Sequence, residues 1–146
     1  MLNAEYLNSA LVGSGLVAQV LEAQGLDAIV ELLTNLRSVE FPVAILESRN
    51  AGTLQLVEGP LDTYTESIWI MGQFGRGESE SALYEQMRQL SIRVLAKILD
   101  DFKSGTAVLQ GWNHNRTAYM KRYGGQNARG WELVLTFNDD ISCCNG

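Results

Sequence analysis

A stripe of large apolar residues between Ser79 and Phe102 is the clearest pattern along the chain. Its members recur at spacings of three and four: Leu83, Met87, Leu90, Val94, Leu95, Ile98, Leu99 and Phe102. This spacing predicts an amphipathic helix over residues 79–103 whose other face is solvated. Ser79 or Ser81 can cap its start, and Gly105 stands where a left-handed residue often ends a helix. At ~1.5 Å per residue the helix would span about 36 Å, enough to cross a sheet.

The segments on either side of this helix alternate between apolar and polar residues, which is the pattern of strands. Residues 39–47 and 53–57 predict two strands, and the turn residues between them predict a hairpin. Residues 62–74 predict a third strand, in which Trp69 and Met71 have the parity opposite to Ile68 and Ile70. Both faces of that strand are therefore expected to be covered, either by a helix or by a neighbouring subunit. Residues 106–112 and 131–137 predict two further strands.

Residues 3–36 are helical in pattern, but Gly13, Gly15 and Gly25 interrupt the apolar spacing. Because each glycine costs a helix interior about 1 kcal/mol relative to alanine, we expect two or three short helices there. A chain of 146 residues is the size of one domain. The sequence thus predicts a single α+β domain over residues 1–146, with one mostly antiparallel sheet, a long central helix packed on one face, and short N-terminal helices.

Residues 113–130, called the basic arm below, fit neither periodicity. The arm carries Arg116, Lys121, Arg122 and Arg129 and no acidic residue, so its charge is +4, while the remaining 7 basic and 17 acidic residues sum to −10. Three interpretations are open. The arm is an extended hairpin that happens to be basic, or it docks on the acidic surface of the next identical subunit, or its cations and tyrosines bind nucleic acid. The net charge of −6 weighs against general nucleic-acid binding.

Candidate chemistry is sparse in this sequence. His114 is the only histidine, and no nucleophile motif accompanies it. The pairs Asp100–Asp101 and Asp139–Asp140 offer the carboxylates that Mg²⁺ prefers, yet solvation of a helix end and of a strand end explains them as well. We therefore predict no catalytic residue, no cofactor and no metal, and a protein that is not an enzyme.

The sequence also predicts a compartment. Cys143 and Cys144 are adjacent, so they cannot link distant parts of the fold, which favours a reducing cytoplasm. No secretory signal is evident, and the longest early stretch without a charge, Tyr6 to Leu21, has 16 residues. That is shorter than the ~20 apolar residues that span a bilayer, so no membrane association is expected.

Four stretches, in this order, suggest a family. They are FPVAILE at Phe41 to Glu47, ESIWIMGQF at Glu66 to Phe74, the long helix, and GWELVLTFNDD at Gly130 to Asp140. With N-terminal helices before them, they resemble the tail-terminator and tail-completion (neck) proteins of long-tailed bacteriophages and prophages. The resemblance implies a non-catalytic subunit of a ring, commonly a hexamer, that caps the tail tube and offers a surface to the head-side connector. Such a protein would occur in the host cytoplasm and in the virion.

The hypothesis that follows is a homo-oligomer, such as a hexameric ring, in which the arm of one subunit meets an acidic and partly apolar patch on the next. Tail-tube and head-connector proteins are the other partners that the resemblance implies. Interface candidates carry the aromatic, methionine and cationic side chains that are frequent at interfaces: Trp69, Met71, Arg116, Tyr119, Lys121, Arg122, Tyr123 and Arg129. The alternative is a small cytoplasmic accessory module that binds nucleic acid through the arm.

Overall fold

The computed structural model describes residues 1–35, 39–115 and 119–140; within these ranges the side chains of residues 49, 50, 119 and 140 are not described. Arg116, Cys143 and Cys144 lie outside the described residues. The elements are α1 (Ala4–Leu7), the π-helical turn η1 (Asn8–Val12), β1 (Gln19–Glu22), α2 (Leu26–Thr34), β2 (Val43–Gln55), β3 (Leu61–Gln73), α3 (Glu80–Lys103), the 3₁₀ turn η3 (Ala107–Leu109), β4 (Tyr119–Gly124) and β5 (Ala128–Asp140).

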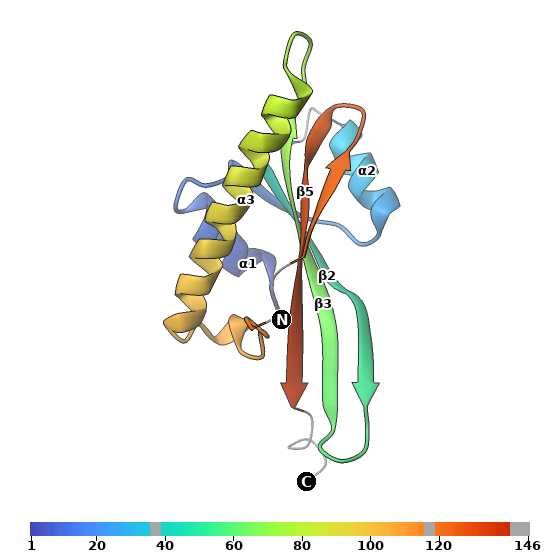
Figure 1. The fold of residues 1–146 in the computed structure, drawn as a ribbon, viewed down its shortest axis with the longest axis vertical. Helices are drawn as coiled ribbons and strands as arrows, with labels where there is room; N and C mark the ends of the chain where they lie inside the picture. Colours follow the sequence, from blue (N-terminus) through green and yellow to red (C-terminus); the bar gives the residue numbers. More distant parts are fainter. Residues whose placement is uncertain (36–38, 116–118, 141–146) are drawn as a thin grey trace.

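The strands form one five-stranded sheet in the order β1-β2-β3-β5-β4. β1 pairs with β2 in parallel, and the three other ladders are antiparallel. This arrangement, with a long helix against the sheet, confirms the predicted α+β class. Figure 1 shows that β2, β3 and β5 extend well past the helices at one end, where the β2–β3 hairpin forms the lower tip of the molecule. No helix in the described part of the chain is long and apolar enough to cross a bilayer.

The predicted long helix is present as α3, with the expected ends. The side chain of Ser79 accepts a hydrogen bond from the Ala82 backbone N–H, and Gly105 adopts a φ of 86° beyond the last turn. The apolar stripe faces the sheet and forms the larger core with Ile68, Ile70 and Leu133. The stripe residues that are buried are Leu83, Met87, Leu90, Val94 and Ile98.

Strand β3 is buried on both faces over residues 68–71. Ile68 and Ile70 lie under α3, whereas Trp69 and Met71 form a second core with Ile29 and other residues on the α2 side. Trp69 is 6% exposed and Met71 is fully buried. The helix alternative for these two residues is therefore confirmed. A helix of the same chain covers them, and their role as interface candidates stays a prediction.

Two strand predictions within residues 39–74 are wrong in their boundaries. β2 does not turn at 49–52 but continues to Gln55, with a register shift between Glu47 and Ala51, and it pairs along its length with β3. A β-bulge absorbs the irregular residues while pairing continues, so the turn-like composition there marks a kink and not a hairpin. The hairpin turn lies instead between β2 and β3, where Gly59 has a φ of 83°.

The predicted strand at 106–112 is also wrong. Residues 107–109 form the turn η3, which buries Leu109, and Trp112 contributes only an isolated bridge to Phe137. A short apolar run cannot be distinguished from a buried turn by periodicity alone. Residues 3–36 were predicted to form short helices, but residues 19–22 form strand β1. This segment is too short to be stable as an independent helix, and its parallel pairing with β2 stabilises it as a strand.

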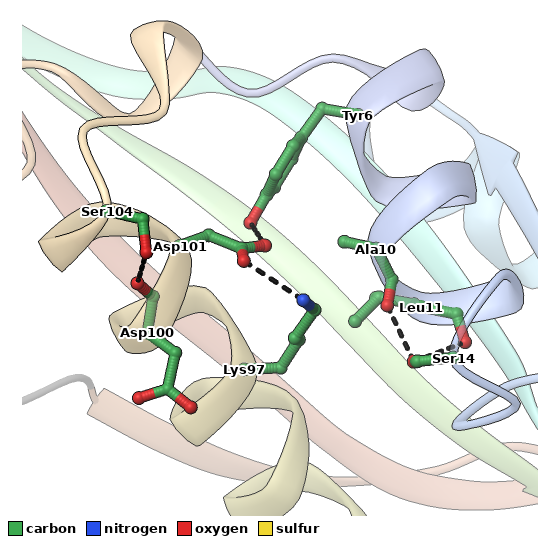
Figure 2. A network of polar contacts seen from close by, with 8 residues as sticks. All are labelled: Tyr6, Ala10, Leu11, Ser14, Lys97, Asp100, Asp101 and Ser104. Carbon is green, nitrogen blue, oxygen red and sulfur yellow. Dashed lines mark hydrogen bonds and ion pairs between the residues drawn. The ribbon is translucent and has the colours of Figure 1, made fainter.

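A polar contact fastens the N-terminal helices to α3. Figure 2 shows Tyr6 pointing at Asp101, to which its hydroxyl donates at 2.7 Å, while Lys97 Nζ lies 3.0 Å from the other carboxylate oxygen of Asp101. Ser14 Oγ donates to the Ala10 carbonyl oxygen at 2.6 Å, next to η1. Burial, together with the Asp101 carboxylate, raises the pKa of Tyr6 well above its usual range.

The Tyr6→Phe variant should lower the free energy of unfolding by about 1–2 kcal/mol, because the hydrogen bond to a charged acceptor is lost. Urea denaturation would measure this difference. Ser9→Ala, which removes an exposed hydroxyl nearby, serves as the control and should change the value by less than about 0.5 kcal/mol.

The same contact predicts a pH dependence. The folded chain keeps the Tyr6 hydroxyl protonated, whereas the unfolded chain loses that proton near pH ~10. The contact between Tyr6 and Asp101 therefore contributes fully to the free energy of unfolding below about pH 10, and its contribution declines as the pH rises further. Above that pH the free energy of unfolding should fall more steeply for the natural chain than for Tyr6→Phe; equal slopes would contradict the assignment.

Candidate interaction surface

The described part of the basic arm forms a hairpin at one edge of the sheet. β4 pairs with residues 129–134 of β5, and Gly125 N–H donates to the Ala128 carbonyl oxygen at 2.9 Å to close the turn. β4 ends the strand order, so its outer edge has no neighbouring strand among the described residues. Of the three interpretations of the arm, the extended hairpin thus describes its geometry. The other two interpretations, docking on the next subunit and binding of nucleic acid, concern the partner of the hairpin and not its geometry.

Arg129 stabilises the base of this hairpin from within. Its Nε lies 3.1 Å from Glu80 Oε1, and its guanidinium lies 4.3 Å from the centre of the Phe74 ring. Its Nη1 also donates to the carbonyl oxygens of Gly125 and Ala128. The Arg129 side chain is only 14% exposed. Its contacts therefore assign it to the fold, although it was a predicted interface residue.

Arg122 is also held by its own chain. Its guanidinium lies 3.7 Å from the centre of the Tyr84 ring on α3, a cation–π distance. Trp131 Nε1 donates to the Tyr84 carbonyl oxygen at 2.9 Å, so strand β5 joins the same contact. The pair links the hairpin to the face of the sheet that α3 covers.

Lys121 and Tyr123 lie on the opposite face, with Trp69. The Tyr123 and Trp69 rings meet edge to face at 5.0 Å between centres, and burial raises the pKa of Tyr123. In the strand register Lys121 stands opposite Glu132, which stands opposite Trp69. Three of the predicted interface residues are thus brought together. For Tyr119 the structure gives only a backbone position in β4.

These residues line a cavity of about 250 Å³ at the start of α2, called the α2–β4 pocket below. Its lining residues are Leu26, Glu47, Trp69, Lys121, Arg122, Tyr123 and Glu132. Leu26 is 54% exposed at the rim. The indole nitrogen of Trp69 is buried and has no hydrogen-bond partner among the described residues. The pocket therefore combines apolar walls, an exposed cation and a buried donor.

Sequence reasoning missed Leu26, Glu47 and Glu132 because the pocket depends on strand pairing. Glu47 Oε2 accepts the backbone N–H of Gly25 at 2.9 Å, and Gly25 is the residue that precedes the first turn of α2. A carboxylate at a helix N-terminus is favourable and fixes where the helix begins. Glu132 Oε2 accepts from Ser67 Oγ at 2.7 Å. In the sequence, a single glutamate within an alternating strand pattern does not indicate that it will make either of these hydrogen bonds.

The remaining candidate chemistry is dispersed. His114 is exposed and lies against the ring of Phe102, 4.7 Å between centres. Asp101 is engaged by Tyr6 and Lys97. Among the described residues no three histidine, cysteine or acidic side chains are grouped as metal ligands would be. A cavity of about 420 Å³ beneath the first turns of α3 has Glu78 as its charged lining residue.

No family model matches the chain, and no curated protein matches its sequence.

Gly130→Ala tests how the hairpin is seated on the sheet. A Cβ at Gly130 would collide with the Ile70 carbonyl oxygen and lie 2.8 Å from Met71 Sδ. We expect a loss of about 1–3 kcal/mol in the free energy of unfolding, measured by urea denaturation, because neighbouring backbone must move. Gly75→Ala is the matched control, since its nearest atom would be a Glu78 side-chain oxygen at 3.8 Å. Equal stability of the two variants would show that β5 does not approach β3 as described.

Proposed function

We propose that the chain is a structural protein that works by self-assembly, as a ring subunit that caps or joins the tail tube of a phage or prophage particle. The function needs no catalysis. The protein would be made in the host cytoplasm and incorporated into the virion, with the tube and the head-side connector as its other partners. The proposal rests on the resemblance stated above and on one observation of the structure.

That observation is the basic edge strand of an otherwise acidic chain. β4 ends the sheet, and its Lys121 and Arg122 are exposed although the chain has a net charge of −6. A strand edge that no described strand covers, and a charge opposite to that of the remaining chain, both favour contact with another copy of the same chain. A contact between two different surfaces of identical subunits is head-to-tail, and such contacts close into rings when the rotation permits.

Nucleic-acid binding through the arm receives less support. The Arg122 guanidinium lies 3.7 Å from the centre of the Tyr84 ring, and Arg129 is paired with Glu80 of the same chain. Phosphate binding would require these cations to exchange their present partners. We therefore do not make this alternative a second proposal.

Static light scattering on a sizing column, over a series of protein concentrations, tests the proposal. The mass per particle should rise with concentration toward a fixed multiple of 16.1 kDa, since oligomers assemble by mass action. Electron micrographs of the leading fraction should show closed rings. A mass of one chain at the highest soluble concentration would contradict the proposal.

Replacing both Lys121 and Arg122 by glutamine should raise the dissociation constant of the oligomer about tenfold, because the basic edge loses its charge. Arg88→Gln with Arg93→Gln removes the same charge from exposed positions on α3 and should leave assembly unchanged. Thermal melting would verify that both variants are folded. An oligomer insensitive to the first pair would remove the arm from the interface.

A further inference from the structure

The tip of the β2–β3 hairpin carries the most exposed large apolar side chains of the described chain. Leu54, Leu56 and Val57 are 59%, 68% and 73% exposed. The β2–β3 hairpin that carries them extends past the helices at the lower end of the molecule (Figure 1). Neighbouring apolar side chains left in water on a protruding loop cost solubility, and in a natural protein they mark a contact surface.

Polar contacts within the loop brace the tip. Gln55 Nε2 lies 3.1, 3.3 and 3.3 Å from the carbonyl oxygens of Val57, Glu58 and Gly59, and its two hydrogens are shared among these three acceptors. Glu58 and Gly59 both have positive φ, 57° and 83°, which turns the chain sharply back into β3. A loop fixed in this way loses little conformational entropy when it binds, so its apolar side chains are presented ready for contact.

The tip cannot reach the α2–β4 pocket of its own chain. Leu61 pairs with Asp140 at the tip, whereas Trp69 pairs with Glu132 at the pocket. Leu61 and Trp69 are eight residues apart along β3, which corresponds to about 27 Å at ~3.4 Å per residue. Any contact between the tip and this pocket therefore joins two molecules and is head-to-tail.

The two surfaces are complementary in size and in charge. The pocket has about 250 Å³, the volume of about eight water molecules at ~30 Å³ each, which suits side chains such as leucine and valine. Residues 54–62 include Glu58 and Asp62 and no basic residue, and Lys121 is the exposed cation of the pocket lining that could meet them. The two carboxylates of the pocket, Glu47 and Glu132, accept hydrogen bonds from Gly25 and Ser67 within the chain.

We propose that the β2–β3 tip of one subunit inserts Leu56 and Val57 into the α2–β4 pocket of the next copy of the same chain. This inference rests on the proposed self-assembly and names its interface. The acidic and partly apolar patch expected to meet the basic arm is then the hairpin tip. Repetition of one such contact links every subunit to the next.

Complementation between two damaged surfaces tests the contact. The tip variant Leu56→Glu with Val57→Glu and the pocket variant Leu26→Glu should each raise the dissociation constant at least tenfold and remain single chains at concentrations where the natural chain assembles. Leu26→Glu should leave the fold intact, because an acidic residue is favourable in the first turn of α2. Mixed in equal amounts, the two variants should form a dimer of mass about twice 16.1 kDa, since one intact tip then meets one intact pocket.

The control is Ile92→Glu, which places the same charge at an apolar α3 residue that is 41% exposed, and it should assemble normally. A tip variant that assembles like the natural chain would overturn the inference while leaving the proposed function standing. A mixture that stays monomeric, although each variant is folded, would also overturn it. A natural chain that never assembles would instead refute the proposed function, so the two failures are distinguishable.

A designed disulfide checks the geometry independently. In a chain with Cys143→Ser and Cys144→Ser, cysteines at Val57 and Leu26 should cross-link on mild oxidation into a ladder of covalent multimers. Val57→Cys paired with a cysteine at Gln89, an exposed residue of α3, is the matched control and should give no such ladder. Equal ladders from both pairs would show random collision and would contradict the proposed contact.

Discussion

The fold depends on the burial of both faces of one strand. Over residues 68–71 β3 places Ile68 and Ile70 on one side and Trp69 and Met71 on the other, and all four are at most 6% exposed. A sheet in water can leave one face solvated, but this segment cannot, so it needs a helix on each side. α3 supplies the long cover and α2 the short one (Figure 1). The lower parts of β2, β3 and β5 lie beyond α2, and there the sheet narrows to a protruding hairpin.

That asymmetry gives the molecule two different surfaces. The start of α2, fixed by Glu47, leaves a pocket between the helix and β4. Eight residues away along β3, the hairpin tip holds Leu54, Leu56 and Val57 in water. Both features follow from the same sheet, because β3 is long enough to contribute to a core in one part and to end in a tip in another. A subunit with an apolar projection and a separate pocket is suited to repeated head-to-tail contact.

The sequence predicted those parts of the fold that periodicity determines. The stripe in α3, its Ser79 cap, its Gly105 ending and the two covered faces of β3 all depend on local spacing, and they are present. Short elements were predicted less well: β1 exists because it pairs with β2, and η3 replaces a strand because Leu109 is buried by a turn. The pocket was beyond prediction, since Leu26, Trp69 and Glu132 are far apart in the chain and meet through strand register. Lys121 and Tyr123 were predicted from composition alone, which could not show that Arg122 and Arg129 are held within the fold.

A reconstruction of the assembled particle by electron cryo-microscopy tests the central claim most directly. We expect a closed ring with one kind of contact between neighbours, in which density for the β2–β3 tip enters the pocket beside Leu26 and Trp69 of the next subunit. Rings in which the tips are free, or in which neighbours meet through the same surface on both sides, would contradict the head-to-tail contact. Particles without rotational closure would contradict the proposed ring.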